Sequence, residues 1–182
     1  MTTKILNLGE ITDLLARTPE VLDALLGGTT GFWHNVAEGP ETWSAFDVLG
    51  HLIHGEETDW IPRARIILST GVAQSFEPFD RFAQFERFKG RTLNDLLGQF
   101  RTCRADNLEI LKGWDLQAEH FAREGVHPAF GTVTLGQLLA TWAVHDLNHL
   151  AQIARVMTGS VVDQVGPWQS YLSIVQARAD FR

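Results

Sequence analysis

A long helical segment at residues 135–156 constrains the fold of this chain most strongly. Apolar side chains recur there at the spacing of one helix face: Leu135, Leu138, Trp142, Ile153 and Val156. His145 and His149 occupy the same face, because residues i and i+4 of an α-helix lie one above the other. Burying two imidazoles costs free energy unless each ring nitrogen has a partner. Either a shared metal ion or hydrogen bonds to neighbouring core side chains can supply those partners.

Three further segments show helical periodicity. They cover residues 8–26, 44–68 and 93–112, and a shorter helix is expected at residues 167–177. No segment has a convincing strand pattern. The sequence therefore predicts an all-α four-helix bundle with a short extra C-terminal helix, and residues 1–182 are expected to form a single helical bundle domain.

Two prolines fall inside the predicted helices. Pro19 either kinks the first helix or begins a second segment with Thr18 as its N-cap. Pro62 is expected to bend the second helix, which begins at the N-cap residue Ser44.

A long crossover, residues 71–90, connects the second and third predicted helices. It carries phenylalanine at every third position: Phe76, Phe79, Phe82, Phe85 and Phe88. This spacing drifts around an α-helix, and Pro78 disfavours one continuous helix, so we expect short helical pieces held by aromatic rings. A crossover of this length allows the second and third helices to run parallel, whereas simple alternation of all four helices is the other topology. The Phe76–Phe88 segment is either a wall or lid over a pocket or merely a cover for apolar surface.

Two histidines and a glutamate on the second helix are candidate site residues. By helical-wheel angle His51 flanks the apolar stripe and can reach the interior, whereas His54 points away and is expected at the surface. Glu56 falls near the centre of the apolar stripe, so either this face is exposed to solvent or Glu56 has a buried partner. The helical rise places His51 at a height similar to that of His145 and His149, which is compatible with one shared site.

Composition excludes several classes of function. The chain has 15 Lys and Arg against 22 Asp and Glu, a net charge of −7, which disfavours nucleic acid or an acidic membrane as a partner. No run approaches the roughly 18 apolar residues of a membrane span, and the N-terminus shows no signal peptide. Cys103, the one cysteine, suits a reducing compartment and lies among apolar positions, which favours a packed thiol over a nucleophile. A cytoplasmic protein that binds neither nucleic acid nor membrane is therefore expected.

Two stretches of sequence resemble a known family. SAFDVLGHLIHGEETDW at residues 44–60, followed by HDLNHLAQI at residues 145–153, is similar to the DinB-like superfamily of metalloenzymes. Its members resemble four-helix bundles with a long crossover after the second helix and a metal held by three residues, usually histidines. The resemblance implies that His51, His145 and His149 bind a divalent metal ion, with Zn, Ni or Fe as the candidates.

The match extends beyond the ligands, with two departures. Gln152 matches a frequent glutamine of the family, and Glu56 matches a common acidic position. Asn148 stands where many members have a second adjacent histidine, and Ala151 where many have glycine. Neither departure removes a ligand, but both alter the surroundings of the implied metal.

Three neutral imidazoles leave coordination positions of a divalent ion open, as in catalytic zinc sites. The family resemblance implies two chemistries for such a site. One is a thiol-dependent S-transferase that uses a low-molecular-weight thiol, and the other is a hydrolase; both act on a small-molecule substrate. Glu56 is the candidate catalytic residue, with Asp47 and Asp146 as further carboxylates, and the family resemblance also implies a homodimer. Two alternatives stay open: a non-enzymatic metal- or ligand-binding bundle with a sensor or stress-response role, and a bundle with metal-free structural histidines.

Overall fold

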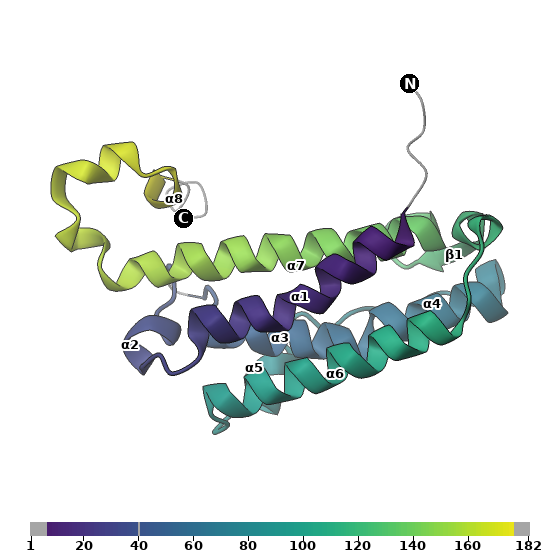
Figure 1. The fold of residues 1–182 in the computed structure, drawn as a ribbon, viewed down its shortest axis with the longest axis horizontal. Coiled ribbons are helices and arrows are strands. Elements are labelled where there is room, and N and C mark those ends of the chain that lie inside the picture. The colour runs from purple at the N-terminus through teal and green to yellow at the C-terminus, as the bar shows by residue number, and fades with distance from the viewer. Residues whose placement is uncertain (1–6, 40, 177–182) are drawn as a thin grey trace.

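Four helical rods form a bundle in the computed structural model, which describes residues 7–39 and 41–176 (Figure 1). The prediction of an all-α four-helix bundle is confirmed. The rods are α1 (Leu8–Leu26), α3 (Ala45–Thr58) continued by α4 (Trp60–Ser69), α6 (Leu93–Gly113) and α7 (Leu135–Met157). Within the described ranges, none of the helices combines the length and apolar character that a membrane-spanning helix needs.

The crossover makes two neighbouring rods parallel. α3, α4 and α6 run in one direction along the bundle, and α1 and α7 run in the other (Figure 1). Between α4 and α6 the crossover contains the 3-10 helix η1 (Gly71–Ala73) and the short helix α5 (Ala83–Arg87), and it returns the chain to the end where α3 begins. The parallel arrangement of the second and third long helices is therefore the one the chain adopts.

Only some aromatic rings of the crossover hold it to the bundle. Phe76 and Phe88 are each 2% exposed and Phe79 is half-buried, whereas Phe82 and Phe85 are 63% and 41% exposed. Since the threefold spacing turns the rings to different sides, the segment cannot bury all of them against one surface.

A small β-hairpin, which the sequence analysis did not predict, precedes α7. Its strands are β1 (Glu124–His127) and β2 (Gly131–Thr134), paired antiparallel from Glu124↔Thr134 to His127↔Gly131. The backbone N–H of Phe76 donates to the carbonyl of Val126 at 2.9 Å, which ties the crossover to the hairpin. Each strand has only four residues and lacks a clear alternation of buried and exposed positions, which explains why the pattern was missed.

The remaining short elements lie in the connections and at the C-terminal end. They are α2 (Gly31–His34), η2 (Ala118–Ala122), η3 (Thr158–Ser160), η4 (Val162–Gln164), η5 (Gly166–Tyr171) and α8 (Ser173–Gln176). The C-terminal helix predicted at residues 167–177 is instead η5 followed by α8, and its last residue, Ala177, lies outside the described residues. Trp168 and Tyr171 are 69% and 86% exposed, so packing contributes little to a longer helix there.

Capping residues set the beginnings of the long helices. Ser44 and Asp47 form a capping box at α3, Thr92 and Asp95 form one at α6, and α7 begins with an equivalent box. The bend expected at Pro62 lies slightly earlier, because the helix breaks between α3 and α4 at Asp59. Pro62 then falls in the first turn of α4, where its missing N–H costs no hydrogen bond.

The bundle interior consists of two apolar clusters separated by a polar layer. One cluster lies toward α2 and includes Leu22, Leu26, Leu49, Ile53, Leu96, Phe100 and Ile153. The other lies toward the hairpin and includes Leu15, Trp60, Ala64, Leu111, Leu139 and Trp142. Between them each rod contributes buried polar side chains, which we call the polar layer: Thr18, Glu56, Arg104, Asn107 and Asp146.

Pro19 explains one contact of this layer. α1 continues through Pro19, so Thr18 is not an N-cap, and its hydroxyl instead donates to Asp146 at 2.6 Å. Because proline has no N–H, the carbonyl of Leu15 lacks its usual helical donor. The Arg104 guanidinium donates to that carbonyl at 2.7 Å and so satisfies it from α6.

A glycine on α3 allows the crossover to pack closely, and its replacement tests this packing. A Cβ at Gly50 would lie 2.9 Å from Cδ2 of Phe88 and 3.1 Å from Cβ of Gln84. We expect Gly50→Ala to lower the free energy of unfolding by about 1–3 kcal/mol because of this overlap. The matched control is Gly98→Ala on α6, where nothing lies within 4 Å of the added Cβ. That change should raise stability by about 0.5–1 kcal/mol, and urea unfolding followed by circular dichroism would compare the two. A stabilised Gly50→Ala variant would contradict the close packing.

Candidate metal centre

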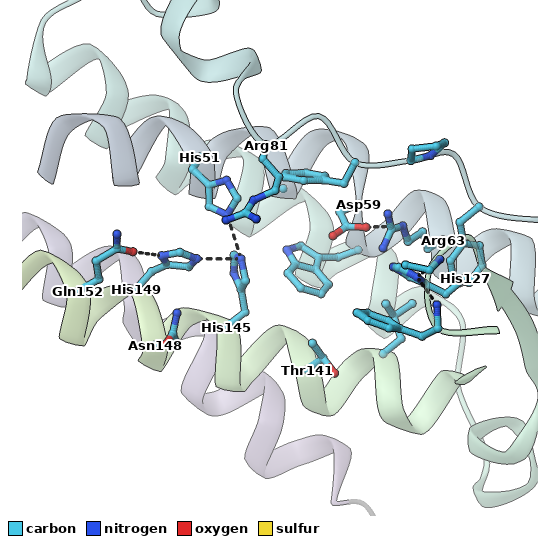
Figure 2. Close-up of a pocket in the computed structure, with 18 of the residues that line it drawn as sticks. His51, Asp59, Arg63, Arg81, His127, Thr141, His145, Asn148, His149 and Gln152 are labelled. Atoms are coloured by element: carbon cyan, nitrogen blue, oxygen red, sulfur yellow. Dashed lines mark hydrogen bonds and ion pairs between the residues drawn. The ribbon is translucent and has the colours of Figure 1, made fainter. Parts of the chain in front are cut away.

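Three histidines from two rods converge on one point. His51 lies on α3, and His145 and His149 lie one turn apart on α7. The Nε2 atom of His145 is 3.2 Å from Nε2 of His51 and 3.1 Å from Nε2 of His149 (Figure 2). The ring centroids are 4.3–5.2 Å apart. The structure thus brings together the three residues that the sequence analysis selected.

The donor set fits a divalent metal ion. Nitrogen ligands about 2.0–2.1 Å from a tetrahedral zinc lie roughly 3.3 Å from one another, which is close to the distances to His145. One ligand atom from each of the three residues lies within 4.8 Å of the others. Hydrogen bonds alone cannot satisfy these atoms well, because a neutral imidazole has one N–H and the Nε2 atoms face each other.

The site holds its imidazoles in the neutral form. Burial, followed by the charges of His149, His54 and Arg81, lowers the pKa of His51 to about 3. Burial, followed by His149, His51 and Arg104, lowers the pKa of His145 to about 2, and burial also lowers the pKa of His149. Imidazole coordinates metals in its neutral form, so near pH 7 the three rings are in the binding state.

A glutamine orients one of the rings. Nδ1 of His149 lies 2.7 Å from Oε1 of Gln152, one turn further along α7 (Figure 2). The amide oxygen accepts a hydrogen bond, so the proton of His149 resides on Nδ1 and the lone pair of Nε2 points toward the other rings. The buried Nδ1 atoms of His51 and His145 have no hydrogen-bond partner among the described residues.

Aromatic side chains from three segments surround the histidines. The Trp43 ring lies 4.8 Å from the His51 ring and stacks on His149 at 6.4 Å. Trp60 approaches His145 edge-on at 5.1 Å, and Phe79 approaches His51 edge-on at 5.4 Å. These rings reduce the access of water to the imidazoles and account for much of their burial.

The prediction that His54 lies at the surface is wrong. His54 is 8% exposed, and its ring lies 4.8 Å from the Phe79 ring. On a helical wheel His54 falls on the face of α3 opposite the apolar stripe, and the crossover covers that face instead of leaving it to solvent. His54 nevertheless lies outside the cluster of three histidines.

Glu56 has a buried partner, which was one of the two alternatives that its sequence position left open. Its Oε1 accepts hydrogen bonds from Arg104 and from the Trp142 indole, both at 2.8 Å. Asn107 donates to Oε2 at 3.0 Å. Asp146, on α7 between the two histidines, also binds Arg104, with contacts of 2.6 and 3.0 Å. Neither carboxylate is directed to the metal-binding atoms by a contact in this structure.

The third candidate carboxylate has a local role at a helix end. Asp47 accepts hydrogen bonds from the backbone N–H and the hydroxyl of Ser44 at the start of α3. It therefore completes the capping box of the helix that carries His51.

Arg104 and Asn107 were missed as parts of this interior. Arg104 is 1% exposed and stacks between the rings of Phe100 and Trp142, at 4.9 and 5.2 Å. Burial alone would lower the pKa of its guanidinium, but Glu56 and Asp146 hold that pKa above its usual range. The sequence does contain a signal for their burial, because Arg104 and Asn107 follow the apolar Phe100 by four and seven residues and so lie on the same face of the helix.

The histidines open onto a cavity of about 1040 Å³. Its walls come from α3, α4, α7, the crossover, the hairpin and the loop around Trp43. Phe76, Phe79, Phe130 and Leu138 contribute apolar surface, and the far side carries Asp59 and Arg63, which form an ion pair (Figure 2). A cavity of this volume accommodates a small-molecule ligand.

Cys103 does not contribute a nucleophile to the cavity. It lies on α6, half-buried, with Sγ 4.0 Å from Oε1 of Glu57, and does not line the cavity. Burial, followed by the charges of Glu57, Glu56 and Asp106, raises the pKa of its thiol to about 11. The thiol is therefore protonated near pH 7, as the packed-thiol interpretation expected.

Comparisons with known proteins agree with this architecture. A search among curated protein sequences finds no match. Among solved structures, YfiT from Bacillus subtilis, described as a probable metal-dependent hydrolase with an unusual four-helix bundle topology, superposes with a TM-score of 0.71 at 20% identity, covering 82% of this chain and 85% of YfiT. TT2238, described as a four-helix bundle protein, superposes with a TM-score of 0.55 at 21% identity, covering 81% of this chain and 98% of TT2238.

The family model of the DinB superfamily matches residues 14–153, a range that includes most of α1 and α7, the whole of α3, α4 and α6, and the three histidines. Because this match spans most of the sequence, the chain belongs to the DinB superfamily.

Proposed function

We propose that this protein is a metal-dependent enzyme acting on a small molecule, with a divalent ion held by His51, His145 and His149. The single observation that carries the proposal is the convergence of three neutral imidazole nitrogens on the wall of a large cavity. The description of YfiT as a probable metal-dependent hydrolase supports it by fold analogy. Zn, Ni and Fe are the proposed ions, since each binds imidazole readily.

The protein contributes orientation and shielding to this chemistry. When bound by three imidazoles, a divalent ion retains an open position and acts there as a Lewis acid toward water or a thiol. Gln152 fixes the ring of His149, Trp43 and Phe79 limit solvent access, and the cavity positions the substrate beside the histidines. The two proposed reactions are hydrolysis and transfer of an electrophilic group from the substrate to the sulfur of a low-molecular-weight thiol, in which the new bond to sulfur replaces the bond to the substrate's leaving group and the thiol proton leaves with that group.

Glu56 enters the proposal as a positioning residue. Its carboxylate oxygens accept hydrogen bonds from α6 and α7, and it thereby fixes α3, which carries His51, against both helices. A role in proton transfer, which the sequence analysis suggested, is not favoured by these contacts. The homodimer implied by the family resemblance and the cytoplasmic location expected from the composition stay predictions.

Metal content and metal removal test this function. Protein purified without a histidine tag or chelating column is expected to carry about one divalent ion per chain, measured by elemental analysis. Removing the ion with a chelator should abolish hydrolysis of an activated ester panel or thiol consumption with an electrophile panel, and re-adding Zn, Ni or Fe should restore it. The His127→Ala variant, changed at a cavity residue outside the cluster, is the matched control for metal content and should keep the metal. Metal-free protein with full activity would contradict the proposal.

A non-enzymatic metal- or ligand-binding role is the second candidate. One observation favours it: Glu56 and Asp146 are bound to Arg104, and the cavity residues Asp59 and Glu38 form ion pairs with Arg63 and Arg155. Each of these four carboxylates is therefore held by an arginine in this structure. Tight metal binding without turnover in either substrate panel would support this role over the enzymatic one.

A further inference from the structure

One arginine on the cavity wall forms no ion pair within the part of the chain that the structure describes. Arg81 belongs to the crossover, is exposed, and lines the same cavity as the three histidines. Its side chain extends toward His51 (Figure 2). Its guanidinium makes no ion pair or hydrogen bond to any residue in the described ranges.

The other two arginines of the cavity wall are already paired. Arg63 forms an ion pair with Asp59, and it donates a hydrogen bond to the carbonyl of Glu77 at 3.3 Å. Arg155 binds both carboxylate oxygens of Glu38, at 2.7 and 3.1 Å. Arg81 is therefore the arginine of this wall whose donors are available to a ligand.

The charge of Arg81 reaches the histidines. Burial is the main cause that lowers the pKa of His51 and of His149, and the charge of Arg81 lowers both further. Glu41, an exposed carboxylate that also lines the cavity, is not among the groups that perturb either ring. Among the charged side chains that line the cavity, Arg81 is thus the one whose charge acts on both His51 and His149, and Asp146, which does not line the cavity, acts on His149 in the opposite direction.

We propose that Arg81 binds an anionic group of the ligand, so that the substrate or thiol that occupies this cavity carries a carboxylate or a similar anion close to its reacting atom. This inference rests on the proposed function, because it assumes that the reacting atom lies at the three histidines. Three neutral imidazoles add no negative charge to offset a divalent cation, and a nearby guanidinium makes the site more positive still. An anionic ligand would neutralise part of that charge and receive charge-assisted hydrogen bonds from Arg81.

Three small thiols that differ in charge test the proposal. Cobalt-loaded protein is titrated with 3-mercaptopropionate, 3-mercapto-1-propanol and cysteamine, which are anionic, neutral and cationic, and binding is followed by the thiolate-to-cobalt absorption band. We expect Arg81→Gln to weaken the binding of 3-mercaptopropionate about tenfold, the effect of losing one charge-assisted contact. The affinities for the other two thiols should change less than about twofold, which is within the range expected for the loss of an exposed charge. Arg81→Lys should restore part of the affinity, since lysine retains the charge but not the planar fork.

A second arginine serves as the control. Arg65 lies on α4, is exposed, and does not line the cavity, so Arg65→Gln should leave all three affinities unchanged. Equal affinity of the parent protein and Arg81→Gln for 3-mercaptopropionate would overturn the proposal, and so would an equal loss for all three thiols. A preference for cysteamine would instead assign the charge selectivity to Glu41 and also overturn it.

The metal site and the anion site can fail separately. Failure of the protein to hold cobalt would reject the proposed function, and absence of a thiolate band would reject thiol binding. In either case calorimetry with 3-phenylpropionate and 3-phenyl-1-propanol decides the role of Arg81 without relying on the metal. A preference for the acid that Arg81→Gln removes would support an anion site, and identical binding of acid and alcohol would overturn it.

Discussion

Replacing His145 with alanine is expected to weaken the binding of a divalent ion by more than about 100-fold, because loss of a direct ligand should exceed the 10–100-fold cost typical of an outer-shell partner. His145 is the central member of the cluster, since its Nε2 lies within 3.2 Å of Nε2 of both other histidines. Removing it leaves His51 and His149 on different helices without the ring between them.

Two further variants calibrate that measurement. Gln152→Ala removes the partner of His149 Nδ1 and is expected to weaken the binding of the metal ion by about 10–100-fold. His127→Ala should leave the affinity unchanged, because His127 lines the cavity but lies outside the cluster. Competition titrations with a chromogenic chelator would rank the variants, with circular dichroism to show that each is folded. A His145→Ala variant with the parental affinity would refute the assignment of the three histidines.

Arg104→Met should lower the free energy of unfolding by about 3–5 kcal/mol, the cost typical of breaking a buried ion pair from one side. The guanidinium contacts Glu56, Asp146 and the carbonyl of Leu15, and all of the ionisable partners are 1–2% exposed. Methionine has a similar length and fills the space between Phe100 and Trp142, so the loss reflects the stranded carboxylates rather than a cavity. The variant is expected to fold poorly or to unfold at a much lower urea concentration.

Urea unfolding with linear extrapolation measures this loss, and Arg101→Met provides the comparison. Arg101 is 57% exposed on the same helix and pairs with Asp23, so its replacement should cost less than about 1 kcal/mol. A second test neutralises the partners: adding Glu56→Gln and Asp146→Asn to Arg104→Met should recover part of the stability, because the unpaired charges are then absent. No difference between Arg104→Met and Arg101→Met would show that the polar layer contributes little.

The sequence was sufficient for the four rods because local signals were strong. Capping residues such as Ser44 and Thr92 stand at the starts of α3 and α6, and apolar side chains recur at the helical spacing along each rod. The sequence was less informative where tertiary contacts decide the conformation. Pro19 sits inside α1 because Arg104, from a distant part of the chain, satisfies the carbonyl that proline leaves without a donor.

The candidate site was predictable to the extent that its residues share a helix. His145 and His149 follow from a four-residue spacing, whereas the addition of His51 depended on resemblance to a family. The burial of His54 could not be predicted, because it depends on how the crossover passes over α3 and places Phe79. The position of Arg81 on the cavity wall could not be predicted for the same reason, since only the folded crossover brings it to the cavity.

The segments that form the cavity suggest that reactivity and selectivity can change independently. The three histidines belong to the rigid rods α3 and α7, whereas Arg81, Phe79, Trp43 and Phe130 lie in connecting segments. Connections tolerate exchange and length variation better than packed helices do. Laboratory evolution confined to residues 38–43, 76–82 and 127–133 could therefore retarget this scaffold to new compounds while the coordinating helices keep their sequence.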